Sequence, residues 1–196
     1  MRFRLFGLIL ASALLSAPAA WAASYTLDAD HTTIQFKIRH LLTPVAGSFN
    51  QLEGSFDYEP DHPESWKVQA VIQAASIDTR VSQRDEHLRS ADFFEAEKYP
   101  TITFESRKIS GYDKAAGAAK LEGDLTIRGI TRPVILDLEI HGVADDPWGN
   151  TRAGFTATGK INRKDFGLNW NQALETGQLL VGEEVQILLE VEGIRQ

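Results

Sequence analysis

The stretch LEGDLTIRGITRPVILDLEI, residues 121–140, decides the fold class. Apolar or small side chains largely alternate with polar ones on both sides of a turn at Gly129. The apolar positions are Leu121, Gly123, Leu125 and Ile127 before the turn, and Val134, Leu136, Leu138 and Ile140 after it. A period of two places successive side chains on opposite faces of an extended chain. The stretch therefore predicts two antiparallel strands, each with one apolar face and one polar, solvent-exposed face.

The same alternation recurs along most of the chain. It covers residues 33–39, 66–74, 102–107, 152–161 and 185–192, and turn-forming residues separate these runs at 59–63 and 145–150. The parity slips between residues 47 and 58, which predicts a β-bulge near 51–54. We expect Trp148 to pack beneath the 145–150 turn. Residues 81–94 break the strand pattern and suit a helix.

The lengths of the predicted strands distinguish a barrel from a sandwich. Several alternating runs reach ten residues, whereas strands are most often five or six residues long. Long strands with few breaks favour a closed up-and-down sheet, which has no free edges. We therefore expect an all-β fold: a closed antiparallel barrel of eight strands with one or two short helices at one end.

The inward positions indicate whether such a barrel is hollow. Many are small, namely Ala70, Ala74, Gly123, Ala153, Ala157 and Gly159. An eight-stranded barrel can hold one small ligand, and small inward residues leave space for it. The predicted wall of an apolar site consists of Phe36, Ile38, Phe49, Phe56, Ile72, Phe104, Gly123, Leu125, Leu136, Phe155, Ala157 and Trp170. The alternative is an ordinary, filled core.

Composition and the first residues limit the partners and the compartment. The net charge of −7 argues against nucleic acid or anionic membrane surfaces as bulk partners, and without cysteine there are no disulfides. Arg2 and Arg4 precede an apolar run and Ala20-Trp21-Ala22, the pattern of a secretory signal peptide. The run is shorter than the roughly 20 residues that span a bilayer. We predict a cleaved signal peptide at 1–22, a single domain at 23–196 and no stable membrane anchor.

Short sequence motifs in a fixed order carry a family resemblance. They include RDEHL at 84–88, DFF at 92–94, YPTITF at 99–104, GITRPV at 129–134, DPWG at 146–149 and NRKDFG at 162–167. Together they resemble the YceI-like family of bacterial lipocalin-like barrels that bind polyisoprenoids and related long-chain lipids. Arg128 departs from this pattern, because the family often has a histidine there.

The resemblance implies a periplasmic binding protein and not an enzyme. Its expected ligand is an apolar small molecule: a polyisoprenoid, an isoprenoid quinone or a fatty-acid derivative. The expected state is a monomer or homodimer. The alternatives are a stress-response barrel with a filled core and an enzyme that acts on an isoprenoid lipid.

Arg84, Asp85 and His87 are the most chemically suggestive cluster in the sequence. Three interpretations remain open: acid–base catalysis, a clasp that caps the helix and ties it to the barrel, and contact of Arg84 and His87 with a ligand head group. For catalysis, the sequence offers no cysteine and no Gly-x-Ser-x-Gly motif that could supply the nucleophile. The five histidines form no ligand pair of metal-site spacing, so we expect neither metal nor cofactor.

Overall fold

The computed structural model describes residues 22–175 and 177–196. The strands in this part of the chain are β1 (Ala23–Leu27), β2 (Thr33–His40), β3 (Thr43–Phe49), β4 (Leu52–Tyr58), β5 (Lys67–Gln73), β6 (Ile77–Asp78), β7 (Thr101–Asp113), β8 (Ala118–Ile127), β9 (Ile130–Asp145), β10 (Thr151–Asn162) and β11 (Val181–Arg195). The helices are η1 (Pro63–Ser65), η2 (Ala74–Ser76), α1 (Ser82–Arg89) and η3 (Arg163–Phe166), of which only α1 is an α-helix. No described helix has the length and apolar character needed to cross a membrane.

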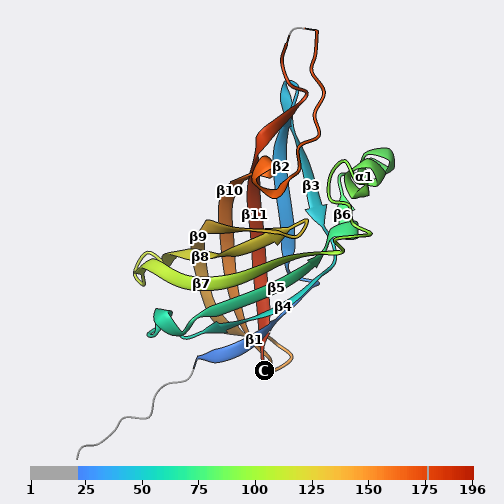
Figure 1. The fold of residues 1–196 in the computed structure, drawn as a ribbon. Coiled ribbons are helices and arrows are strands. Elements are labelled where there is room, and N and C mark those ends of the chain that lie inside the picture. The colour runs from blue at the N-terminus through green and yellow to red at the C-terminus, as the bar shows by residue number, and fades with distance from the viewer. Residues whose placement is uncertain (1–21, 176) are drawn as a thin grey trace, which may run out of the picture.

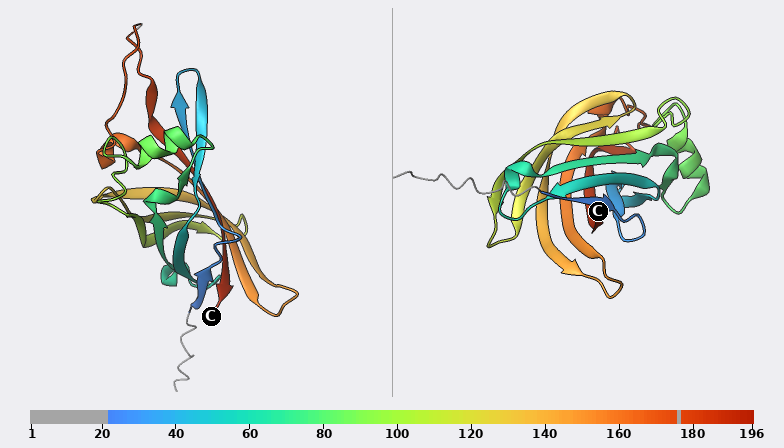
Figure 2. Two further views of the ribbon diagram at one scale, coloured as in Figure 1. Left: turned by 90° about the vertical axis from the view of Figure 1, so that its right-hand side faces the viewer. Right: turned by 90° about the horizontal axis from the view of Figure 1, so that it is seen from below.

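The eleven strand segments close into one barrel (Figure 1). β2 and β1 pair in turn with β11, through Val181–Glu190 and Gly193–Arg195. β3 and β4 likewise pair with β2 and β1, and β6 and β5 with β3 and β4. β1 and β2 are thus two halves of one broken strand, as are β3 with β4 and β5 with β6. The eleven segments therefore form eight strands of the barrel. All pairs are antiparallel and follow chain order, and the strands wrap around a common centre when seen from below (Figure 2). The predicted eight-stranded closed barrel is confirmed.

The predicted β-bulge near residues 51–54 is wrong. The register from β4 to β1 and β5 is regular, and the strand is instead interrupted at Asn50 and Gln51, whose backbone still bonds to Ser76 and Gln73. Phe49 and Leu52 both face inward across this two-residue break, which produces the same slip of parity. Gly54 serves close strand packing, because a Cβ there would lie 2.2 Å from the Gln69 carbonyl oxygen.

α1 is shorter than predicted. It ends at Arg89 and not near residue 94, because the following backbone folds back on its last turn. The amides of Phe94 and Ala96 donate to the carbonyls of Leu88 and Arg89 at 3.0 and 2.9 Å. This return places Phe93 in the core, with 7% of its surface exposed.

The turn at residues 145–150 differs from the prediction. Trp148 does not pack beneath its turn, since 80% of its surface is exposed. The Asp146 side chain organises the turn instead, accepting from the amides of Trp148 and Asn150 at 2.9 Å each. The predicted signal peptide, residues 1–22, lies outside the described residues except for Ala22.

Candidate functional site

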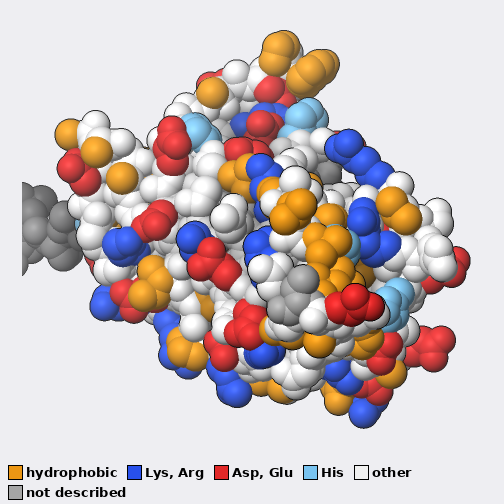
Figure 3. Space-filling view, turned by 90° about the horizontal axis from the view of Figure 1, so that it is seen from above, with side chains coloured by type: hydrophobic (Ala, Val, Ile, Leu, Met, Phe, Trp, Pro, Cys, Tyr) orange, Lys and Arg blue, Asp and Glu red, His pale blue; other side chains and the backbone are white. Residues whose placement is uncertain are grey.

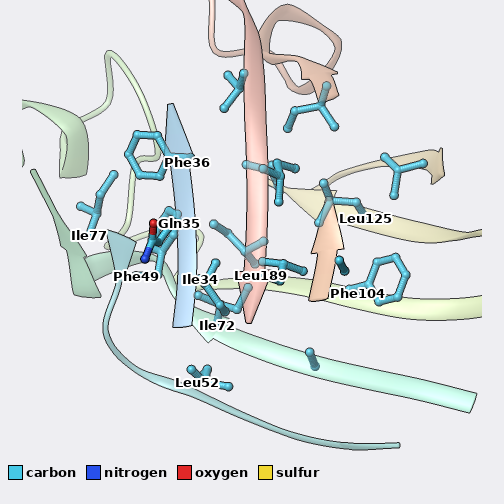
Figure 4. Close-up of a pocket in the computed structure, with 18 of the residues that line it drawn as sticks. Ile34, Gln35, Phe36, Phe49, Leu52, Ile72, Ile77, Phe104, Leu125 and Leu189 are labelled. Carbon is cyan, nitrogen blue, oxygen red and sulfur yellow. The ribbon is translucent and has the colours of Figure 1, made fainter. Parts of the chain in front are cut away.

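A cavity of about 650 Å³ occupies the barrel interior. This volume is within the usual range for small-molecule sites. Figure 4 shows Ile34 and Phe36 from β2 and Leu189 from β11 pointing into the same space as Phe104 and Leu125 from β7 and β8. The wall is mostly aliphatic and aromatic. Its polar and charged members, apart from tyrosine and tryptophan, are Thr32, Gln35, His40, Asp57, Thr79, Gln83, Arg84, His87 and Arg163.

Eleven of the twelve predicted wall residues line this cavity, and the exception is Gly123. Gly123 does face inward, but the Phe104 ring covers it. A Cβ on Gly123 would lie 2.4 Å from Phe104 Cζ. Gly123 thus makes room for a wall side chain and not for a ligand.

Packed aromatic rings form the lower end of the cavity. Phe56, Tyr58, Trp66 and Phe155 line it, Tyr25 stacks behind Phe56, and we call these five residues the aromatic floor. Phe155 meets Phe56 and Tyr58 edge to face at centroid distances of 5.2 and 5.0 Å. Burial raises the pKa of Tyr58 to about 12, so this phenol is neutral at ordinary pH. The floor therefore offers an apolar end to the cavity.

The opposite end opens beside α1. Val81 and Gln83 line the cavity and are also exposed, so the cavity reaches the surface there. Hydrophobic side chains gather on this face with basic ones beside them (Figure 3). The exposed apolar residues on the segments around the opening are Leu41, Leu42, Val81 and Leu179.

Hydrogen bonds clasp α1 to the segment that precedes it. Buried Asp85 accepts from the Thr79 amide at 2.9 Å and from Thr79 Oγ1 at 2.5 Å. Arg84 Nε and Nη2 donate to Thr79 Oγ1 and to the Thr79 carbonyl, both at 2.7 Å. Arg89 donates to the carbonyls of Ala75 and Ile77. Asp85 does not cap the helix, because Val81 is the N-cap residue and has no side-chain cap.

His87 packs among aromatic rings at the opening. Its ring meets Phe93 and Trp170 edge to face at 5.1 and 4.9 Å, and its Nε2 lies 2.8 Å from Asp92 Oδ2. Arg84 and His87 both line the cavity, as expected of the two predicted head-group residues. Their contact with a ligand stays a prediction.

Arg128 connects the β8–β9 turn to other segments at the open end of the barrel. Arg128 and Gly129 have φ values of 53° and 72°, as a two-residue type I′ turn between β8 and β9 requires. The guanidinium donates to the Gly167 carbonyl and pairs with Glu95 Oε2 at 3.1 Å. The residue that departs from the family pattern therefore joins the turn to η3 and to the segment after α1.

Arg163 is a wall residue that sequence reasoning missed. It begins η3 and is only 3% exposed. Its Nε donates to the Gly182 carbonyl at 2.8 Å and its Nη1 to the Leu168 carbonyl. Its position in the NRKDFG motif was the only signal in the sequence, and a motif does not reveal burial.

A charged cluster ties the strands together at the lower end. Arg152 on β10 contacts Asp28, Asp146 and Glu192, with nitrogen–oxygen distances of 2.6, 2.8 and 2.5 Å. These hydrogen bonds hold the pKa values of Asp28 and Asp146 below their usual range. Asp28 and Glu192 also lie near His31 in an arrangement that could hold a metal, but Arg152 already supplies their counter-charge.

Comparisons with known proteins agree with this geometry. The model of the family described as "YceI-like domain" matches residues 25–193. The chain belongs to the YceI-like family. Among YceI-like relatives, it is 42% identical to a "UPF0312 protein" of Pseudomonas aeruginosa, covering 98% of this chain and 97% of that one. It is 39% identical to "Protein YceI" of Escherichia coli O157:H7 over the full length of both.

A solved structure from another organism has the same fold. It is a polyisoprenoid binding domain from Saccharophagus degradans, implicated in plant cell wall breakdown. The TM-score is 0.67 at 17% identity, covering 89% of this chain and 99% of that domain. This likeness shows the common fold.

Proposed function

We propose that this protein is a non-enzymatic carrier that holds a long apolar lipid chain, of the polyisoprenoid or isoprenoid-quinone type, inside the barrel. The cavity carries this proposal: about 650 Å³, walled by aliphatic and aromatic side chains, with an aromatic floor. The S. degradans domain of the same fold, described as polyisoprenoid-binding, supports the ligand class.

The energetics of burial favour such a ligand. Each buried CH₂ group contributes roughly 0.8 kcal/mol, so a five-carbon prenyl unit contributes about 4 kcal/mol at most. Two or three buried units would reach micromolar to nanomolar affinity before the costs of ordering are subtracted. A filled core would not leave a cavity of this size, which favours a carrier over a solid stress-response barrel.

The polar groups near the opening support binding over catalysis. The Thr79 hydroxyl donates to Asp85 and accepts from Arg84, so both its proton and its oxygen are engaged. His87 packs between rings and faces Asp92. A nucleophile held by a free base, which an enzyme acting on the lipid would need, is not found among the described wall residues. The signal-peptide pattern at residues 1–22 supports a periplasmic location for the carrier.

Filling the cavity tests the proposal. Ala157 lines the wall and is 4% exposed, so Ala157→Phe places a ring where the chain would lie. The adjacent Thr156 faces outward and bonds Glu190 Oε2 at 2.6 Å, which makes Thr156→Phe the matched control. We expect native mass spectrometry of protein purified from its own cells to show a bound lipid in wild type and Thr156→Phe, and none in folded Ala157→Phe.

A lipid retained by Ala157→Phe, with a large fall in melting temperature, would identify Ala157 as core and contradict the proposal. Absence of any apolar ligand in wild type, and no uptake of geranylgeraniol by the purified protein, would do so as well.

A further inference from the structure

Arg163 is a buried cation that forms no ion pair with the carboxylates of the described residues. Its Nη2 also has no hydrogen-bond partner in that part of the chain. Glu183, the carboxylate whose charge acts on it, accepts from Lys164 Nζ at 2.5 Å instead. The two carbonyls that Arg163 contacts satisfy two nitrogens but do not neutralise its charge.

Such a group is unusual, because a buried charge is normally paired. Burial lowers the pKa of Arg163 from its ordinary value, but guanidinium groups stay protonated in proteins. Its positive charge therefore acts within an apolar cavity, where the low dielectric screens it little. An anion in the cavity would supply the missing counter-charge.

The other charged wall residues give the ligand an orientation. Asp57 lies beside Tyr58 at the floor, but its carboxylate accepts from Ser24 Oγ at 2.6 Å on the outer face, so the floor carries no inward charge. Arg84 lies at the opening, but it shares Thr79 with the buried carboxylate of Asp85, which offsets its charge. Arg163 shares no partner with a buried carboxylate in this way, and Glu183, whose charge acts on it, is bonded to Lys164 instead. The positive end of the cavity is thus the end where η3 lies.

The backbone around Arg163 holds the guanidinium in place. Asn162 caps η3 by accepting from the Lys164 amide at 2.9 Å, and Phe166 is 1% exposed. The bonds from Nε and Nη1 fix the plane of the group and leave Nη2 as the remaining donor nitrogen. Nη2 is itself covered, so a direct bond requires a neighbouring side chain to move, whereas the charge acts without contact.

We propose that the ligand is a lipid acid: a long apolar chain ending in a phosphate or carboxylate, with its head beside Arg163 and its tail toward the aromatic floor. This inference rests on the proposed function and adds the charge of the head group to it.

The test compares three probes with the same tail: geranylgeranyl phosphate, geranylgeranoic acid and geranylgeraniol. Trp66 and Trp170 line the cavity, so quenching of tryptophan fluorescence reports binding. We expect wild type to bind at least one acid 10-fold or more tighter than the alcohol, because the buried charge of Arg163 attracts an anion across a low-dielectric cavity. The preferred acid distinguishes a phosphate head from a carboxylate head.

Arg163→Met should abolish the preference and still bind the alcohol, and Arg163→Lys should keep most of it. Arg107→Met is the matched control, because Arg107 is an exposed arginine that pairs with Asp124 outside the cavity. Equal affinities of wild type for acid and alcohol would overturn the inference while leaving the proposed function intact. So would a preference that disappears in Arg84→Met but survives in Arg163→Met. Failure of wild type to bind any probe would overturn both.

Discussion

At the scale of single residues, Gly123 shows how closely β7 and β8 approach. A Cβ on Gly123 would lie 2.4 Å from Phe104 Cζ and 2.6 Å from the Glu105 carbonyl oxygen. Gly123→Ala therefore forces a ring and a backbone oxygen to move. We expect it to lower the free energy of unfolding by about 1–3 kcal/mol, as overpacking does. Thermal unfolding followed by circular dichroism measures this loss.

Gly154→Ala is the matched control for this prediction. Gly154 lies in β10, and a Cβ there would be 3.7 Å from His141 Cβ and 3.9 Å from the Val191 carbonyl oxygen. These are ordinary contact distances, and neither glycine has a positive φ. We expect a change within about 0.5 kcal/mol. Equal losses in the two variants would show that the Gly123 contact is unimportant.

Single residues also show where sequence reasoning ends. Alternation placed Gly123 correctly on the inner face, but the rotamer of Phe104, which covers it, is set by packing. Arg163 was invisible for a similar reason: its burial follows from contacts with Gly182 and Leu168, which the chain order does not reveal. A pattern predicts the face on which a residue lies, and packing decides what it meets there.

At the scale of elements, the clasp holds α1 beside the cavity opening. We expect Asp85→Asn to lower the free energy of unfolding by about 1–3 kcal/mol, because the buried acceptor of the Thr79 amide and hydroxyl loses its charge. Hydrogen exchange of the Thr79 amide should speed up more than exchange in β8 and β10. Both changes together indicate that α1 loosens locally from the barrel.

Glu86→Gln removes the same charge from the neighbouring, exposed residue of α1 and serves as the control. Its effect should stay within about 0.5 kcal/mol. If Asp85→Asn and Glu86→Gln behave alike, the clasp does not hold the helix.

The ends of elements were harder to predict than their type. Residues 90–94 have helix-compatible side chains, yet the chain turns back because the Phe94 amide reaches the Leu88 carbonyl. The slip of parity after Phe49 has two local explanations, a bulge and a strand break. Only the pairing partners of β3 and β4 distinguish them, and those partners are distant in sequence.

At the scale of the whole molecule, strand length and alternation were sufficient to predict the barrel. Runs such as residues 121–140 contain their own turn and register, so the meander is encoded locally. Closure is not local, because β11 must find β1 and β2 at the other end of the chain. The pairing of β1 with β11 is short, from Tyr25↔Arg195 to Leu27↔Gly193.

Arg152 reinforces this closure and makes it sensitive to acid. Its hydrogen bonds hold the pKa values of Asp28 and Asp146 below the ordinary value near 4, so these carboxylates stay ionised in the folded chain at a pH where the unfolded chain takes up protons. Their contribution to stability is therefore complete above about pH 4 and is lost as the pH falls toward the folded-state values.

We expect Arg152→Gln to flatten the fall in melting temperature between about pH 5 and pH 3. Lys120→Gln removes the same charge from an exposed pair with Asp137 and should leave the slope unchanged. Parallel curves for wild type and Arg152→Gln would contradict this, and acid would then weaken the barrel through other carboxylates than those at its closing strands.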